Sequence, residues 1–212
     1  MAASGRCLRR VRDFLSVAIL AALGLGLAGC GDPALESLAP DATILAFGDS
    51  LTEGVGAPAG AAYPAQLAQL TGRKVVNAGV AGESTAEGLE RLPQALEAHA
   101  PDLIILLMGG NDVLRNQDLA EAKRNLDQMI EQAQTNDVAV VLVGVPEKSL
   151  FSQSAPLYEE LAEEHGVLLV DDLVAGLLRR PGYKSDAVHL NAEGYRVMAE
   201  RLAEVLREEG AL

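Results

Sequence analysis

The 212-residue sequence has few aromatic residues, few cysteines and a shortage of positive charge. It contains no tryptophan, and aromatic residues make up only 3% of it, so a stacking platform for nucleobases or sugar rings would have very few rings. Lys and Arg number 17 against 30 Asp and Glu, which gives a formal net charge of −13. Nucleic-acid binding and adhesion to an anionic membrane both need clustered cations, so this balance argues against both.

Two cysteines cannot build a disulfide framework, and their spacing fits no zinc site. The Gly-x-Gly-x-x-Gly dinucleotide pattern is missing, and no P-loop lysine follows Gly54-Val55-Gly56. We therefore expect a protein without cofactor or metal. With 49% hydrophobic and 22% charged residues, disorder is not expected, and the length fits one α/β domain.

The first thirty residues differ from the rest. Four arginines between positions 6 and 12 precede an apolar run over 14–27 that ends in small residues, which is typical of a signal peptide. The run is too short for a comfortable membrane span of about 20 residues. Its end, Leu27-Ala28-Gly29-Cys30, resembles the lipobox of bacterial lipoproteins, which implies cleavage before Cys30 and lipid on its sulfur. An ordinary secretory signal with a coincidental cysteine is the alternative.

This interpretation divides the chain into a signal peptide at 1–29, a lipidated tether at 30–41 and one folded domain at 42–212. Removing residues 1–29, with their four Arg and one Asp, would leave 183 residues with a net charge of −16. The product would be an exported bacterial lipoprotein that faces the periplasm or the cell exterior and is anchored in the membrane through Cys30. We expect this domain to be monomeric.

Beyond the tether, short β-rich apolar runs alternate with helical patterns. Strands are expected at Thr43–Phe47, Lys74–Asn77, Leu103–Met108, Val138–Val143 and Val167–Val170, and helices at Tyr63–Leu70, Ala86–Ala98, Leu119–Gln134, Leu157–Glu164 and Ala192–Glu208. Ser84 and Asp118 each precede a glutamate with capping-box spacing. The alternation predicts a three-layer α/β/α sandwich around a five-stranded parallel, doubly wound, flavodoxin-like sheet.

Residues capable of chemistry follow the strands, at the edge where doubly wound sheets bind ligands. Ser50 comes just after the first strand, and its hydroxyl would become a good nucleophile if a base took the proton. Of the three histidines, His99 and His165 are expected at helix ends on the surface. His189 has Asp186 three residues before it; the carboxylate could accept its Nδ1–H and leave Nε2 to face Ser50.

Acyl transfer also needs hydrogen-bond donors for the oxyanion of the tetrahedral intermediate. The expected donors are the N–H groups of Ser50 and Gly79 and the side-chain amide of Asn111. Gly79 would allow close approach because it has no Cβ. Each signal alone is common in turns and helix caps; their joint occurrence after the first three strands and before the last helix gives them weight.

Taken together, these residues resemble the SGNH (GDSL-type) hydrolases, especially the small bacterial arylesterase, acyl-thioesterase and lysophospholipase branch. Four blocks occur in the family's order within about residues 42–209: Phe47–Gly54, Asn77–Gly79, Gly109–Asp112 and Asp186–Asn191. The resemblance implies Ser50 as nucleophile, His189 as base, Asp186 as its orienting partner, and Ser50, Gly79 and Asn111 as oxyanion donors.

Two positions depart from the family pattern, since Ala187 and Leu190 stand where Gly and Pro are common. Neither position supplies chemistry, so we expect a change in turn rigidity and not in function, provided that the backbone at Ala187 tolerates a Cβ. Segments Val55–Ala62, Asp112–Asp118 and Glu147–Pro156 are expected to line the acyl pocket.

The sequence thus predicts a serine esterase acting on esters or thioesters of modest acyl chains. One alternative is a carbohydrate O-acetylesterase with the same machinery, which the scarcity of aromatics disfavours. Another is a catalytically silent, lipid-anchored binding module. A metal-dependent hydrolase built on Asp49, Asp112, Asp171 and Asp186 is disfavoured, because zinc would require more than one nearby histidine.

Overall fold

The computed structural model describes residues 35–147 and 154–212, which belong to the compact unit formed by residues 33–212. The expected signal peptide, Cys30 and the first part of the tether lie outside the described residues, as do residues 148–153 of one expected pocket segment. In the described ranges, no helix is both long enough and apolar enough to cross a membrane.

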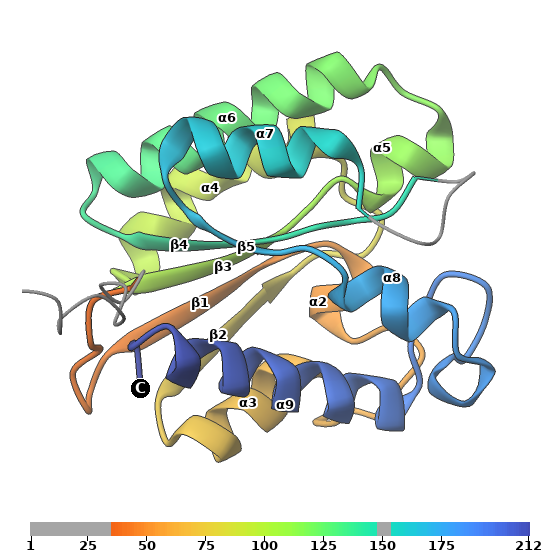
Figure 1. Cartoon of the computed structure of the whole chain (residues 1–212), viewed down its shortest axis with the longest axis horizontal. Coiled ribbons are helices and arrows are strands. Elements are labelled where there is room, and N and C mark those ends of the chain that lie inside the picture. Colours follow the sequence, from red (N-terminus) through yellow and green to blue (C-terminus); the bar gives the residue numbers. More distant parts are fainter. Residues whose placement is uncertain (1–34, 148–153) are drawn as a thin grey trace, which may run out of the picture. The chain divides into compact units, whose positions relative to one another are not determined.

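A parallel sheet forms the centre of this unit (Figure 1). Its five strands are β1 (Thr43–Gly48), β2 (Lys74–Gly79), β3 (Leu103–Leu107), β4 (Ala139–Val143) and β5 (Leu168–Val170), in the order β2-β1-β3-β4-β5. This order confirms the predicted flavodoxin-like arrangement. Every residue of β1 and β3 is buried, as expected for central strands covered on both faces.

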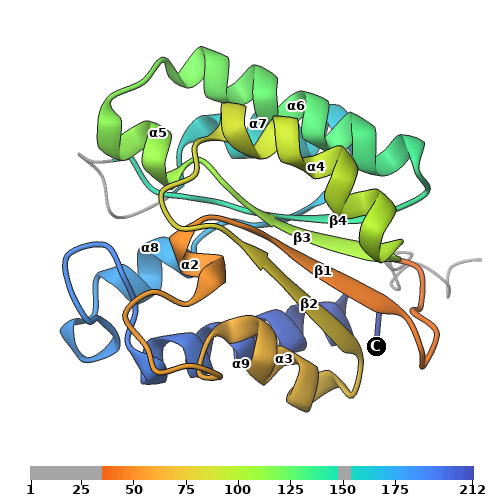
Figure 2. The same cartoon turned by 180° about the vertical axis from the view of Figure 1, so that it is seen from behind.

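Helices cover both faces of the sheet and complete the predicted three layers (Figures 1 and 2). One face is covered by α4 (Thr85–His99), α6 (Leu119–Thr135) and α7 (Pro156–His165), and the other by α3 (Tyr63–Thr71) and α9 (Ala192–Glu208). Ser84 caps α4 in the predicted capping box with Glu87. Asp118 caps α6 by accepting the N–H of Ala120. In the described structure, the Glu121 side chain does not accept the backbone N–H of Asp118, so the predicted capping box is only half formed.

Four short elements were not expected: α2 (Ser50–Glu53), α5 (Gly110–Arg115), α8 (Leu173–Leu178) and the 3₁₀ turn η1 (Pro181–Tyr183). Of these, α2 follows directly after β1, and α5 follows directly after β3. The register aligns the ends of these strands, because Gly48 pairs with both Gly79 of β2 and Leu107 of β3. The loops after the first three strands therefore start side by side at the carboxyl edge of the sheet.

Candidate active site

Ser50 is the first residue of α2, and its side chain meets the loop before α9. The Oγ of Ser50 lies 3.1 Å from Nε2 of His189, and Nδ1 of His189 lies 2.8 Å from Oδ2 of Asp186. Residues 139 positions apart in the chain thus form a continuous hydrogen-bonded relay. Such a relay allows the imidazole to accept the serine proton while the carboxylate holds the ring in the required tautomer.

The turn that carries His189 is organised around the carboxylate of Asp186. Its Oδ1 accepts hydrogen bonds of 2.9 Å from the backbone N–H groups of both Val188 and His189. The Val188 N–H bond and then the bond from the imidazole of His189 lower the pKa of Asp186 to about 2. Ala187 does not adopt a left-handed backbone, so its Cβ is tolerated, and Leu190 is fully buried beneath the turn.

Asp49 supports the site from behind the nucleophile. It caps α2 by accepting the N–H of Leu51 through Oδ1, and its Oδ2 accepts the side-chain amide of Asn111 at 3.2 Å. The side chain is almost fully buried, and this burial raises the pKa of Asp49 to about 6, against the opposing effect of the Leu51 bond. A buried acceptor therefore links the helix of Ser50 to the side chain of Asn111.

The amide of Asn111 also donates a 3.0 Å hydrogen bond to the backbone carbonyl of Glu83. Both of its hydrogens are thus directed at protein oxygens. An oxyanion in the site would compete with these acceptors, and the longer bond, to Asp49, is the one more easily shared. The structure therefore brings Asn111 next to Ser50, as the sequence predicted, but with its donors already engaged.

The backbone N–H of Gly79, expected to be an oxyanion donor, is already bonded to a protein acceptor. This N–H donates to Oδ1 of Asn77 at 2.9 Å. A Cβ on Gly79 would lie 2.0 Å from the backbone nitrogen of Glu53, so the missing side chain lets the end of β2 pack directly on α2. This geometry explains the glycine through packing and does not favour it as an oxyanion donor.

Gly82, in the same loop, offers a backbone N–H that sequence reasoning passed over. Within the described part of the chain, the backbone N–H groups of Ser50 and Gly82 donate to no protein acceptor. Gly82 has a left-handed φ of +83°, and it directly precedes Glu83, whose carbonyl is bonded to Asn111. The signal in the sequence was a second glycine just before the capped start of α4.

The other histidines and carboxylates lie apart from this relay. His99 and His165 stand in the last turns of α4 and α7, and His165 is mostly buried, with Nε2 2.7 Å from Oδ1 of Asp127. Asp112 accepts the N–H and hydroxyl of Thr85, and Asp171 accepts the hydroxyl of Ser154. Across the described ranges, no three His, Cys, Asp or Glu side chains come together as metal ligands would.

A small apolar cleft of about 70 Å³ opens beside the nucleophile. Its walls come from the segments after β1, β3 and β4, from α8 and from the turn before His189: Asp49, Ser50, Leu51, Gly110, Asn111, Val113, Leu114, Val145, Pro146, Val174, Leu178 and Val188. Val113 and Leu114 come from an expected pocket segment, whereas no described residue of Val55–Ala62 lines the cleft. The contribution of α8 was not foreseen.

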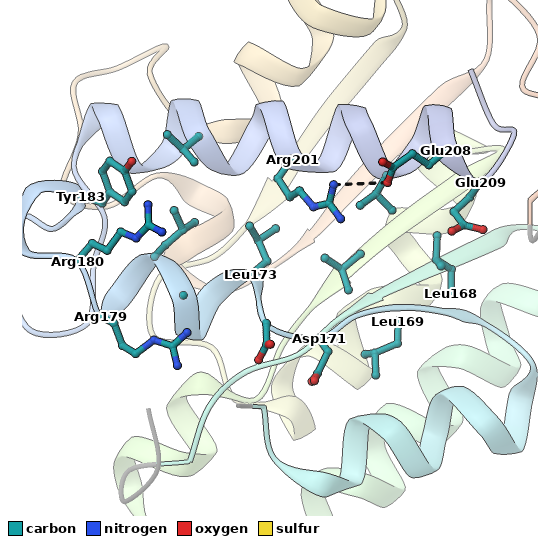
Figure 3. A pocket seen from close by; sticks show the side chains of 16 residues that line it. Leu168, Leu169, Asp171, Leu173, Arg179, Arg180, Tyr183, Arg201, Glu208 and Glu209 are labelled. Carbon is teal, nitrogen blue, oxygen red and sulfur yellow. Dashed lines mark hydrogen bonds and ion pairs between the residues drawn. The ribbon is translucent and has the colours of Figure 1, made fainter. Parts of the chain in front are cut away.

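A larger groove of about 610 Å³ lies along β5, α8 and α9 (Figure 3). Figure 3 shows Arg179, Arg180 and Tyr183 at one end of this groove and Glu208 and Glu209 at the other. Among the described residues, its lining contains no serine, cysteine or histidine. The groove therefore lacks the groups for acyl transfer, and the small cleft beside Ser50 is the candidate active site.

The profile of the GDSL-like Lipase/Acylhydrolase family matches residues 46–197, which include every residue of the relay. The chain belongs to this family. An "Arylesterase" of Vibrio mimicus is 30% identical over 174 residues, covering 77% of this chain and 87% of the relative. The "Thioesterase 1/protease 1/lysophospholipase L1" of Escherichia coli K12 is 28% identical over 173 residues, covering 78% and 83%.

Solved structures of the family agree with this placement. The crystal structure of TesA superposes with a TM-score of 0.71 at 26% identity, covering 79% of this chain and 99% of its own. AlinE4, a SGNH-hydrolase family esterase, gives a TM-score of 0.63 at 32% identity, with coverage of 81% and 98%. This family member is thus a carboxylic ester hydrolase of the SGNH type.

Proposed function

We propose that Ser50 is the nucleophile, His189 the general base and Asp186 the residue that orients it. The observation that carries this proposal is the relay of 3.1 Å and 2.8 Å from Ser50 through His189 to Asp186. Ser50 Oγ attacks the acyl carbon while Nε2 of His189 takes the hydroxyl proton. The tetrahedral intermediate then expels the alcohol or thiol, which leaves with that proton.

Deacylation uses the same groups in the same order. His189 removes a proton from water, the hydroxide oxygen attacks the acyl carbon of the Ser50 ester, and the proton returns to Ser50 Oγ as the carboxylic acid leaves. In both halves, the N–H groups of Ser50 and Gly82 and the amide of Asn111 stabilise the oxyanion. Removal of one such donor typically costs about 2.7–4 kcal/mol of transition-state stabilisation.

The Ser50→Ala variant tests the nucleophile. We expect it to lose hydrolysis of p-nitrophenyl esters and covalent labelling by a fluorophosphonate probe. Ser37→Ala is a control, because Ser37 is exposed and takes part in no hydrogen bond of the relay, and it should keep both. Undiminished labelling of the Ser50→Ala protein would overturn the assignment, whereas failure of the folded wild type to label would favour a silent binding module.

The substrates proposed are esters or thioesters with an acyl chain of modest length. The cleft beside Ser50 is small and mainly apolar. Tyr63, Tyr158 and Tyr195 are fully buried, so they provide no surface on which a sugar ring could stack. A chain-length series of matched oxygen esters and thioesters, run beside acetate release from acetylated glycans, should show turnover of the acyl series. Preferential release from glycans would favour the O-acetylesterase alternative.

We also propose that the enzyme is exported and anchored through lipid on Cys30, and that the folded domain is monomeric. The basic and apolar leader and the Leu27-Ala28-Gly29-Cys30 sequence support the first part of this proposal. Mass spectrometry of the mature protein should find cleavage before Cys30 and an acyl-modified N-terminal cysteine. Cleavage elsewhere with a free thiol would indicate an ordinary secretory signal.

A further inference from the structure

The loop between β2 and α4 is tied to the helix of the nucleophile by one carboxylate. Glu53 is the last residue of α2, three positions after Ser50, and its Oε2 accepts the backbone N–H of Ala81 at 2.6 Å. The length of this contact places it among the shorter N–H···O hydrogen bonds. Ala81 directly precedes Gly82, so this bond fixes the residue next to the oxyanion donor proposed above.

The end of β2, which leads into this loop, also packs against α2. The amide of Asn77 donates to the carbonyl of Glu53 at 3.3 Å, and its Oδ1 accepts the N–H of Gly79. Because Gly79 has no Cβ, its Cα can pack against the backbone of Thr52 and Glu53. The segment from Asn77 to Ala81 is therefore held against α2 at both ends.

Arginines hold the far side of the loop. Arg115 of α5 donates to the carbonyl of Gly82 at 2.6 Å, and Arg91 of α4 pairs with the carboxylate of Glu83 at 2.6 Å. The peptide that carries the Gly82 N–H thus lies between an anchored N–H at Ala81 and an anchored carbonyl at Gly82. Among these contacts, the carboxylate of Glu53 connects the loop directly to the helix of Ser50.

We infer that Glu53 is a positioning residue for acyl transfer: by holding the N–H of Ala81, it sets the direction of the Gly82 N–H relative to Ser50 Oγ. This inference rests on the proposed function, in which Ser50 attacks and Gly82 stabilises the oxyanion. A glycine at a left-handed φ can rotate its neighbouring peptides at little steric cost, so the direction of its N–H depends on such anchors.

Glu53→Ala should lower kcat for p-nitrophenyl esters by roughly 10- to 100-fold, because an oxyanion donor becomes misdirected. KM should change little, since the apolar cleft does not include Glu53. Glu53→Gln should retain most of the activity, because its amide oxygen still accepts the Ala81 N–H. Affinity for an alkyl boronic acid, whose adduct with Ser50 imitates the tetrahedral intermediate, should fall with kcat/KM in Glu53→Ala and recover in Glu53→Gln.

Glu131→Ala, at an exposed position of α6, is the matched control and should leave kcat, KM and boronate affinity unchanged. Thermal unfolding of all variants shows whether a loss of kcat comes from unfolding. Equal kcat and boronate affinity in wild type and Glu53→Ala would overturn the inference, and so would equal impairment of the Ala and Gln variants. Inactivity of Ser50→Ala alongside a fully active Glu53→Ala would leave the proposed function intact and remove only this inference.

Discussion

At the scale of single residues, the two aspartates of the site are shifted in opposite directions for separate reasons. Asp186 is exposed but accepts two backbone N–H groups and an imidazole, and its pKa is lowered to about 2. Asp49 is buried, and its pKa is raised to about 6. Asp186 therefore remains ionised across the range of an ordinary pH profile, whereas Asp49 changes charge within it.

Asp186→Asn should reduce kcat by about 10²- to 10⁴-fold with little effect on KM. An amide presents an N–H as well as an oxygen, so it no longer favours the His189 tautomer that leaves Nε2 free to accept the serine proton. The measurement is steady-state hydrolysis of p-nitrophenyl esters. Asp127→Asn is a matched control, because Asp127 pairs with His165 at 2.7 Å and is not part of the Ser50–His189–Asp186 relay. Equal losses in both variants would argue against a specific role for Asp186.

Asp49→Asn should change how stability depends on pH. The unfolded carboxyl ionises near its ordinary pKa of 3.8 and the folded one near 6, so between these values the folded protein binds more protons. The free energy of unfolding of the wild type then falls as the pH rises through this window, by up to about 3 kcal/mol. The variant has no carboxyl at this position and so does not lose stability in this way. The free energy of unfolding of the variant, minus that of the wild type, should therefore increase from pH 4 to pH 7.

Urea unfolding at four pH values between 4 and 7 measures that difference. A stability difference that stays constant with pH would contradict the buried, proton-binding state of Asp49. The same variant keeps a side-chain oxygen that can accept the Asn111 amide, so this hydrogen bond should be retained.

At the scale of elements, the site depends on the close packing of β2 on α2. Gly79→Ala places a Cβ 2.0 Å from the backbone nitrogen of Glu53, so one of the two elements must move. We expect destabilisation of about 1–3 kcal/mol together with a fall in kcat. Gly182→Ala is the control: its Cβ would meet no atom within 4 Å, and stability should change by less than about 0.5 kcal/mol. Chemical unfolding and ester hydrolysis of both variants provide the measurements.

Helix α8 separates the small cleft from the large groove, and two adjacent leucines face different sides. Leu178 lines the cleft beside Ser50, whereas Leu177 lines the groove along β5 and α9. Both are buried, so either truncation to Ala should cost about 2–5 kcal/mol. Only Leu178→Ala should shift the optimum of an acyl chain-length series toward longer chains. A similar shift in Leu177→Ala would mean that the acyl chain does not enter this cleft.

At the scale of the whole molecule, the elements that could be predicted were those with a strong pattern. The five apolar runs and the long amphipathic helices gave the sheet and its layers, and Asp186 and His189 were predictable because three residues span one turn. The short α2 and α5 have no room for a helical period, and α8 is apolar on nearly every face. Gly82 is proposed in place of Gly79 because the Gly79 N–H is already bonded to Asn77, and only three-dimensional contacts reveal such a bond.

The charge of the whole molecule leads to a prediction about its attachment. If residues 1–29 are removed as proposed, the mature chain would carry a net charge of −16 and would be repelled by anionic lipid headgroups, so electrostatic attraction would not keep it at a membrane. Anchoring would then depend on acyl chains at Cys30, and two or more chains are needed for stable attachment. Full-length Cys30→Ser, expressed in a bacterium that processes lipoproteins, should move from the membrane to the soluble fraction while keeping its specific activity. Membrane association of that variant equal to wild type, and resistant to high salt, would show that Cys30 is not the anchor.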